Sequence, residues 1–122
     1  MLRTYKDLLV WQRSFELVAR IYEVPRKLPD EEKFRLISQM RRAAVSIPSN
    51  IAEGYARDST RDYVRLLWIA KGSLAELETQ VMLSKRLALL GETDTETILN
   101  ELGDIERMLA ALVRKLRARS EQ

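Results

Sequence analysis

The fold of this chain is decided by residues 38–54, which read SQMRRAAVSIPSNIAEG. Within and just before this stretch, apolar side chains recur at spacings of three and four residues, which is the pattern of one buried helix face. These side chains are Ile37, Met40, Ala44, Ile47 and Ile51. Pro48 removes the amide that would bond the Ala44 carbonyl, so we expect a bend there. Because the apolar pattern continues to Tyr55, we predict one proline-kinked helix.

The chain before this stretch predicts a first helix over residues 8–24, with Asp7 as its N-cap. Its apolar face repeats at the same spacings and consists of Leu8, Trp11, Phe15, Val18 and Tyr22. Pro25 and Pro29 then mark a turn, because residues before proline avoid helical angles. We therefore expect the second helix to run from about Asp30 to about Ala56, with Phe34 at the start of its core face.

A third and longest helix is predicted after Ser59 and Asp62, which resemble a capping box. Its expected end is Gly91, which suits a C-terminal cap position. Its predicted core face consists of Tyr63, Leu67, Ala70, Leu74, Leu77, Val81, Ser84 and Ala88.

A second apolar stripe lies beside that core face, so the third helix is apolar over more of its circumference than one subunit requires. The predicted oligomer interface on this stripe consists of Val64, Trp68, Ala75 and Met82. We take Trp68 as its anchor, because tryptophan is enriched among residues that dominate interface energetics. The alternative is that Trp68 is a core residue, since tryptophan is highly buried on average.

The fourth helix is predicted to begin at a Thr93–Glu96 capping box and to fray beyond about Arg117. Its apolar face consists of Ile98, Leu102, Ile105, Leu109, Leu112 and Leu116. Four helices with short connections predict an all-α, antiparallel up-down-up-down four-helix bundle. The 122 residues form a single domain, residues 1–122, with its core in residues 5–117.

Composition narrows the chemistry, because the chain contains no cysteine and no histidine. We therefore expect no metal, no cofactor and a reducing, cytoplasmic setting, with no membrane segment. The carboxylates considered for catalysis are Glu53, Glu76 and Glu78. Glu76 and Glu78 face different sides of a helix, and Glu53 is expected to pair with Arg41 or Arg42. The sequence thus predicts a protein that is not an enzyme.

Charge is unevenly placed, with 16 basic and 11 acidic side chains in residues 1–90 and an excess of acidic ones in residues 91–112. A surface that neutralises phosphates is one interpretation of the arginines around the second turn. Those candidate nucleic-acid-binding residues are Arg35, Arg41, Arg42, Arg57, Arg61 and Arg65. The other interpretation is a solvated face paired with carboxylates, which the modest net charge of +3 favours. In an oligomer, the acidic stretch 91–112 would face the basic stretch 33–71.

Three ordered motifs resemble the bacterial four-helix-bundle family of 23S ribosomal RNA intervening sequences. They are Leu9–Gln12, Ser38–Gly54 and Gly72–Gln80, and the resemblance covers roughly residues 5 to 117. It implies a bundle that assembles into a ring-like homopentamer. The accessory protein of diversity-generating retroelements is similar in fold and assembly, and it binds nucleic acid and a reverse transcriptase. Pro25 and Gly103 depart from the family's usual pattern.

Two function classes remain open at this point. The first is a homo-oligomer that associates with RNA or DNA through its arginines. The second is a protein-binding scaffold, or an accessory subunit of a nucleic-acid enzyme, with no direct nucleic-acid binding. Salt dependence separates the two, because neutralising phosphates makes affinity fall steeply with salt.

Overall fold

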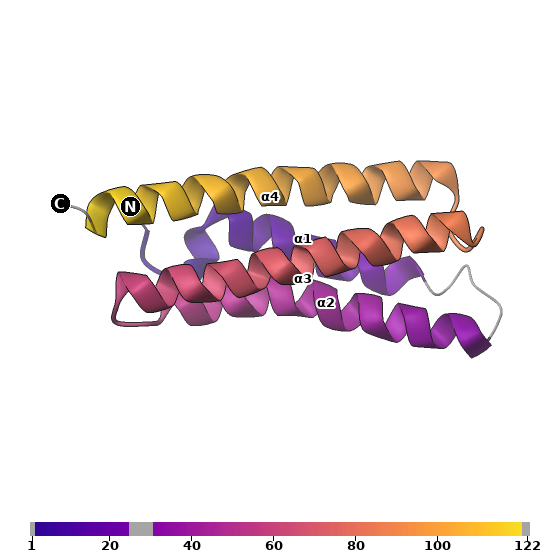
Figure 1. Ribbon diagram of the computed structural model, residues 1–122, viewed down its shortest axis with the longest axis horizontal. Helices are drawn as coiled ribbons and strands as arrows, with labels where there is room; N and C mark the ends of the chain where they lie inside the picture. Colours follow the sequence, from indigo (N-terminus) through magenta and orange to yellow (C-terminus); the bar gives the residue numbers. More distant parts are fainter. Residues whose placement is uncertain (1, 25–30, 121–122) are drawn as a thin grey trace.

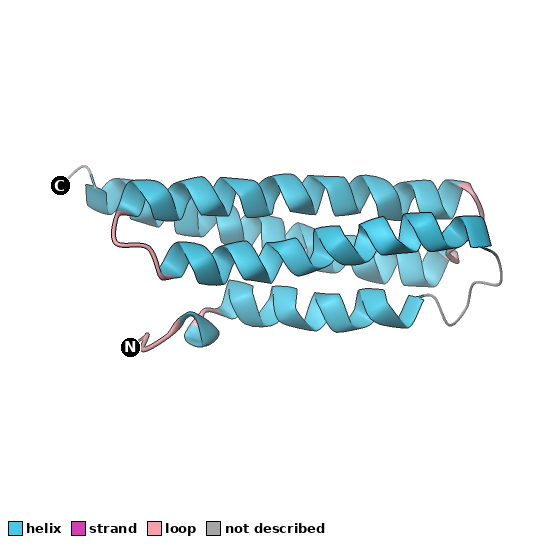
Figure 2. Cartoon of the chain, turned by 90° about the horizontal axis from the view of Figure 1, so that it is seen from below, coloured by secondary structure: helices cyan, strands magenta, loops and turns pink. Residues whose placement is uncertain are grey.

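The computed structural model describes residues 2–24 and 31–120, and every regular element in these ranges is helical. In chain order the elements are the 3₁₀ turn η1 (Tyr5–Asp7), α1 (Leu9–Glu23), α2 (Glu31–Tyr55), α3 (Thr60–Arg86) and α4 (Glu92–Ser120). Figure 2, coloured by secondary structure, shows four long helices and no strand in these ranges. The predicted all-helical class is therefore confirmed. The predicted turn at Pro25 and Pro29 lies outside the described residues.

The four helices lie side by side along one long axis (Figure 1). The α2–α3 connection lies at one end of this array and the α3–α4 connection at the other. Helix α1 packs against α2 and α4, while α3 packs against α2 and α4. Each helix therefore has two neighbours, and one core lies among all four.

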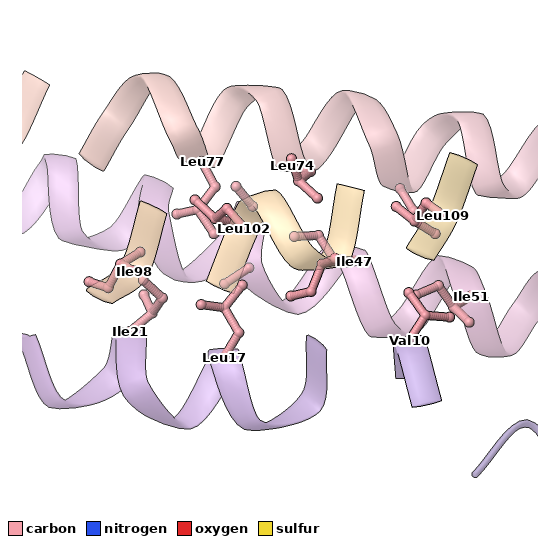
Figure 3. Packing of buried hydrophobic residues seen from close by; sticks show 14 of the residues in the cluster. Val10, Leu17, Ile21, Ile47, Ile51, Leu74, Leu77, Ile98, Leu102 and Leu109 are labelled. Carbon is pink, nitrogen blue, oxygen red and sulfur yellow. The ribbon is translucent and has the colours of Figure 1, made fainter. Parts of the chain in front are cut away.

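The core consists of aliphatic side chains contributed by every helix, as Figure 3 shows. Those labelled in the figure are Val10, Leu17, Ile21, Ile47, Ile51, Leu74, Leu77, Ile98, Leu102 and Leu109. The predicted core face of α2 is confirmed from Ile37 to Ile51, but Phe34 at its start is 64% exposed. The predicted face of α4 is confirmed apart from Leu112, which is only partly buried beside the buried Val113. On α3 the predicted face is buried from Leu67 to Ser84, while Tyr63 is partly exposed and Ala88, beyond the end of the helix, is exposed.

The predicted core face for the first helix is correct at Leu8, which lies just before α1 and belongs to the core, and wrong along α1 itself. The side chains that α1 buries are Val10, Ser14, Leu17 and Ile21. Phe15 is 52% exposed and Tyr22 is 45% exposed, while Trp11 and Val18 are only partly buried. Two apolar stripes with the same spacing run along α1, and the smaller aliphatic stripe faces the core. The aromatic stripe is left on the surface beside α2.

The start of α1 also differs from the prediction, because Asp7 does not cap this helix. Asp7 instead closes η1 with Thr4 in a reciprocal capping box, and its carboxylate accepts from the Thr4 amide at 3.1 Å. Leu8 occupies the N-cap position of α1 and makes no side-chain capping hydrogen bond. The capping signal in the sequence was therefore real but belonged to the preceding turn.

Helix α2 runs through Pro48 as one helix, as the continuous apolar pattern predicted. Beside the proline, the Asn50 side chain donates to the Ser46 carbonyl at 2.8 Å. The Ser46 hydroxyl also lies 2.7 Å from the Ser73 hydroxyl of α3, so polar side chains join α2 to α3 next to the proline. The sequence Ser46–Asn50 thus serves both the helix backbone and the α2–α3 contact.

The predicted helix ends are correct at one position and wrong at others. Ser59 caps α3 as expected, its hydroxyl accepting from the Asp62 amide at 3.1 Å. However, α3 ends at Arg86, and Ala88, with φ 60°, takes the left-handed conformation that was expected at Gly91. Helix α4 begins at Glu92, ahead of the predicted Thr93 cap, and it continues to Ser120.

Candidate nucleic-acid and assembly surfaces

The six arginines proposed from the sequence do not form one patch. Arg35, Arg41 and Arg42 lie on α2, whereas Arg57, Arg61 and Arg65 lie in the α2–α3 connection and the first turns of α3. At about 1.5 Å per residue, Arg35 lies about 30 Å along α2 from the end of that helix. The six arginines therefore extend along much of the length of the bundle and do not form one compact cluster.

Several of these arginines already have partners. Arg57 pairs with Glu53 at 2.6 Å, so Glu53 does not pair with Arg41 or Arg42 as predicted. Arg65 lies 4.0 Å from Asp62. The Arg41 guanidinium lies over the Tyr22 ring, 4.4 Å from its centroid. This leaves Arg35, Arg42 and Arg61 exposed, with no ion pair to any side chain that the structure describes.

A different basic cluster surrounds Trp68, whose side chain is 43% exposed. Lys71 Nζ lies 4.9 Å and Arg117 Cζ lies 5.3 Å from the indole centroid. A hollow of about 200 Å³ opens here between α3 and α4. Its lining consists of Leu67, Trp68, Lys71, Leu109, Ala110, Val113, Arg114 and Arg117. Trp68 is therefore a surface residue flanked by cations, not a core residue.

Three acidic side chains of α4 form ion pairs within the subunit. Asp104 pairs with Arg13 at 2.7 Å, Glu101 pairs with Arg20, and Glu92 lies 3.7 Å from Lys85. Hydrogen bonds from Arg13 and Arg107 lower the pKa of Asp104 below its usual value of 3.8. These internal pairs reduce the acidic charge that the stretch 91–112 could offer to a neighbouring subunit.

An apolar groove lies between α1 and α2, with a volume of about 480 Å³. We call it the aromatic groove. Its lining consists of Tyr5, Trp11, Phe15, Val18, Ala19, Tyr22, Val45, Pro48, Ser49 and Ala52. Trp11 joins this row of rings together, with centroids 5.3 Å from Tyr5 and 4.9 Å from Phe15. Sequence reasoning placed this stripe in the core and so missed the groove.

The predicted interface stripe on α3 is buried at its first residue and exposed at the others. Val64 is 8% exposed and belongs to the core, so it offers no surface to a partner. Met82 is 55% exposed and lines a second hollow of α3 and α4 with Thr95 and Leu99. Ala75 is also exposed. Only the stripe beyond Val64 is therefore available at the surface.

The described residues hold no group of three or more histidine, cysteine or acidic side chains arranged to bind a metal ion. Burial and the neighbouring Tyr55 raise the pKa of Tyr63 to about 12. A tyrosine with such a pKa stays protonated near neutral pH and does not act as a base. Across residues 2–24 and 31–120, we find no helix with the length and apolarity of a membrane span.

The sequence alone could have identified only part of the basic cluster around Trp68. Lys71 lies three residues after Trp68, a spacing that places both on one helix face. Arg117 reaches Trp68, and Arg114 reaches the hollow beside it, only because α3 packs against α4, which no local pattern encodes.

Residues 6–111 match the family model of the 23S rRNA-intervening sequence protein. Among solved structures, the chain is similar to a protein of unknown function from the S23 ribosomal protein family of Bacteroides thetaiotaomicron. The two are 28% identical, the alignment covers 86% of this chain and 98% of that chain, and the TM-score is 0.80. A comparison with curated proteins returned no match.

Proposed function

This chain belongs to the 23S rRNA-intervening sequence protein family, and we propose from that premise that it is a non-enzymatic homo-oligomer that associates with RNA. In this proposal the subunit is an antiparallel up-down-up-down bundle bent at Pro48. Subunits form a closed ring in the cytoplasm, and five is the number that the resemblance implies.

The aromatic groove is the observation that carries the assembly proposal. Phe15 and Tyr22 are about half exposed, although burying a large apolar side chain stabilises a protein by about 1.5–3 kcal/mol. Exposed apolar surface of this kind is a mark of protein interaction sites. Pro48, Val45 and the ring of Trp11 complete a concave surface that another subunit would cover.

A ring also requires a second surface, because a closed ring joins two different faces of each subunit. The part of α3 around Ala75, Met82 and Leu83 supports this role, since all three are exposed. The aromatic groove lies between α1 and α2, whereas Met82 lies beside α4. The two apolar surfaces therefore belong to different helix pairs, as a head-to-tail contact needs.

The assembly proposal is tested by Phe15→Ser combined with Tyr22→Ser. We expect this variant to sediment as a monomer with unchanged helical circular dichroism, because neither side chain belongs to the core cluster. Leu9→Ser is the matched control, since Leu9 is also an exposed residue of α1 but does not line the groove. An oligomer that survives the double substitution would refute the groove as the interface.

Association with RNA is supported by the basic balance of the chain, which carries 21 lysines and arginines against 18 acidic residues. Arg35 and Arg42 on α2 are exposed and lack a carboxylate partner among the described side chains. If both arginines contact phosphates, the double substitution Arg35→Ala with Arg42→Ala should make the slope of log affinity against log salt concentration less steep by about 1.4–1.8. Arg57→Ala is the control, because Arg57 is held by Glu53.

The alternative function is a protein-interaction scaffold, or an accessory subunit of a nucleic-acid enzyme, without direct nucleic-acid binding. A gel-shift assay with structured ribosomal RNA at low salt distinguishes the two functions. We expect a shifted band that disappears at moderate salt. No shift at low salt would contradict RNA association and leave the scaffold as the explanation of the groove.

A further inference from the structure

The cations around Trp68 lie at its indole ring and the adjoining hollow, and they are not paired with carboxylates. Lys71 and Arg117 each lie over the indole, and Arg114 lines the same hollow. None of the three forms an ion pair with a side chain that the structure describes. Three cations that converge without a counter-charge produce a local positive potential that attracts an anion.

Ordinary helix-end electrostatics does not account for this cluster. Basic residues in the last turn of a helix complement its dipole, and this explains Arg117 and Arg119 of α4. Lys71, however, lies in the middle of α3, far from either end. Its ammonium group is held over Trp68 by the ring and not by a helix terminus.

The guanidinium of Arg117 remains able to bind an anion while it contacts the indole. A guanidinium stacks through its flat face and donates hydrogen bonds from its edge, in its own plane. Phosphate oxygens accept such edge hydrogen bonds in pairs. Arg117 forms no ion pair with a described side chain, so its donors remain available while it lies over Trp68.

The hollow itself is small and has an apolar floor. Its volume of about 200 Å³ lies below the roughly 300–1,000 Å³ of sites that enclose drug-sized ligands. Leu67, Leu109 and Val113 form its apolar part. A flat ring with an attached phosphate matches this combination of apolar floor, exposed indole and convergent cations.

We propose that Trp68, Lys71, Arg114 and Arg117 form a binding site for single-stranded RNA. One unpaired base enters the apolar hollow beside the exposed Trp68 ring, and the phosphates on either side of it are held by Lys71, Arg114 and Arg117. The strand must be single, because a base inside a duplex is stacked and cannot reach the indole. This inference rests on the proposed RNA association and adds a base-binding surface to the phosphate contacts proposed for Arg35 and Arg42.

Fluorescence of Trp68 tests the contact directly. The chain has two tryptophans, so Trp11→Phe leaves Trp68 as the only one. We expect a short unstructured single-stranded RNA to quench this fluorescence in a saturable way, and the same sequence as a duplex to leave it unchanged. Equal quenching by the duplex, or by polyglutamate, would overturn the proposal and indicate a general polyanion surface.

Binding measured by fluorescence anisotropy of a labelled RNA tests the individual residues. Trp68→Leu, and separately Arg114→Gln with Arg117→Gln, should each weaken binding of the single strand by about tenfold. The matched control is Lys115→Gln with Arg119→Gln, which removes two charges from the same helix at positions that do not line the hollow. Equal losses in the control and in the Arg114 and Arg117 variant would overturn the site.

Two results distinguish failure of this site from failure of the proposed RNA association. If the wild type binds RNA and Trp68→Leu binds it equally well, the site is wrong while RNA association stands. If the wild type binds no RNA, RNA association fails and the site fails with it. Sedimentation of Trp68→Leu must give the wild-type mass, because a smaller particle would place Trp68 in the subunit interface and overturn the proposal.

Discussion

The guanidinium of Arg13 in α1 lies 2.7 Å from the carboxylate of Asp104 in α4, and this ion pair joins the first helix to the last. Asp104 also accepts from Arg107 one turn further along α4. A second ion pair, Arg20 with Glu101, lies on the same two helices. Charge therefore aligns α1 on α4 along the side opposite the aromatic groove.

Asp104→Asn should make the stability of the bundle less sensitive to a fall in pH. The pKa of Asp104 is lowered in the folded state, so its contribution is present above the unfolded value near 3.8 and is lost as pH falls through the folded value. The difference in melting temperature between wild type and Asp104→Asn should therefore be largest near pH 7 and vanish in strong acid. Thermal melts across this range measure it.

Glu106→Gln is the control for this titration, because it removes an acidic charge from a neighbouring exposed position of α4. We expect its melting temperature to follow that of the wild type more closely at every pH. If the difference between wild type and Asp104→Asn stays constant down to strong acid, the ion pair does not act through the charge of Asp104.

Gly54 occupies a position where even a methyl group does not fit. A Cβ there would lie 2.9 Å from Tyr63 Cδ1 and 3.2 Å from both Leu66 Cβ and the Tyr63 carbonyl oxygen. The carbonyl belongs to the backbone and cannot move aside. We therefore expect Gly54→Ala to lower the free energy of unfolding by about 1–3 kcal/mol in chemical denaturation.

Gly72→Ala provides the comparison for Gly54, because nothing lies within 4 Å of the Cβ that it would add. It should raise the free energy of unfolding by about 0.5–1 kcal/mol through helix propensity alone. If both alanine variants were stabilised, the close approach of α2 and α3 at Gly54 would be refuted.

Pro48→Ala tests the bend that the sequence predicts in α2. Alanine restores the missing amide and removes the ring from the aromatic groove, which Pro48 lines. We expect the free energy of unfolding to change by less than about 1 kcal/mol and assembly to weaken, since the segment after residue 48 would shift against α3. Sedimentation at several protein concentrations measures the assembly, and an unchanged oligomer would mean that the bend is incidental.

The sequence predicted the helices more reliably than the faces that they bury. In α2 and in α4, the apolar residues at spacings of three and four form one dominant helix face, or phase. That face lies against the core. Helix α1 has two such phases. The pattern with Phe15 predicts an aromatic core face, whereas the structure buries the phase that contains Leu17. Leu17 fits among the other helices because the core is filled by aliphatic side chains.

The candidate sites were less predictable because their residues come together only through packing. The arginines that are close in the sequence are spread along α2 and the start of α3. Arg117, which is 49 residues from Trp68 in the chain, lies over its ring. Local spacing identifies neighbours on one helix, but it does not say which helix lies beside it.

The mass of the wild-type protein in solution tests the central claim most directly. Sedimentation equilibrium should give a particle about five times the 14.2 kDa of one chain. This mass should persist at high salt, because the aromatic groove is apolar and salt screens only charged contacts. A particle of 14.2 kDa at every protein concentration would contradict the account.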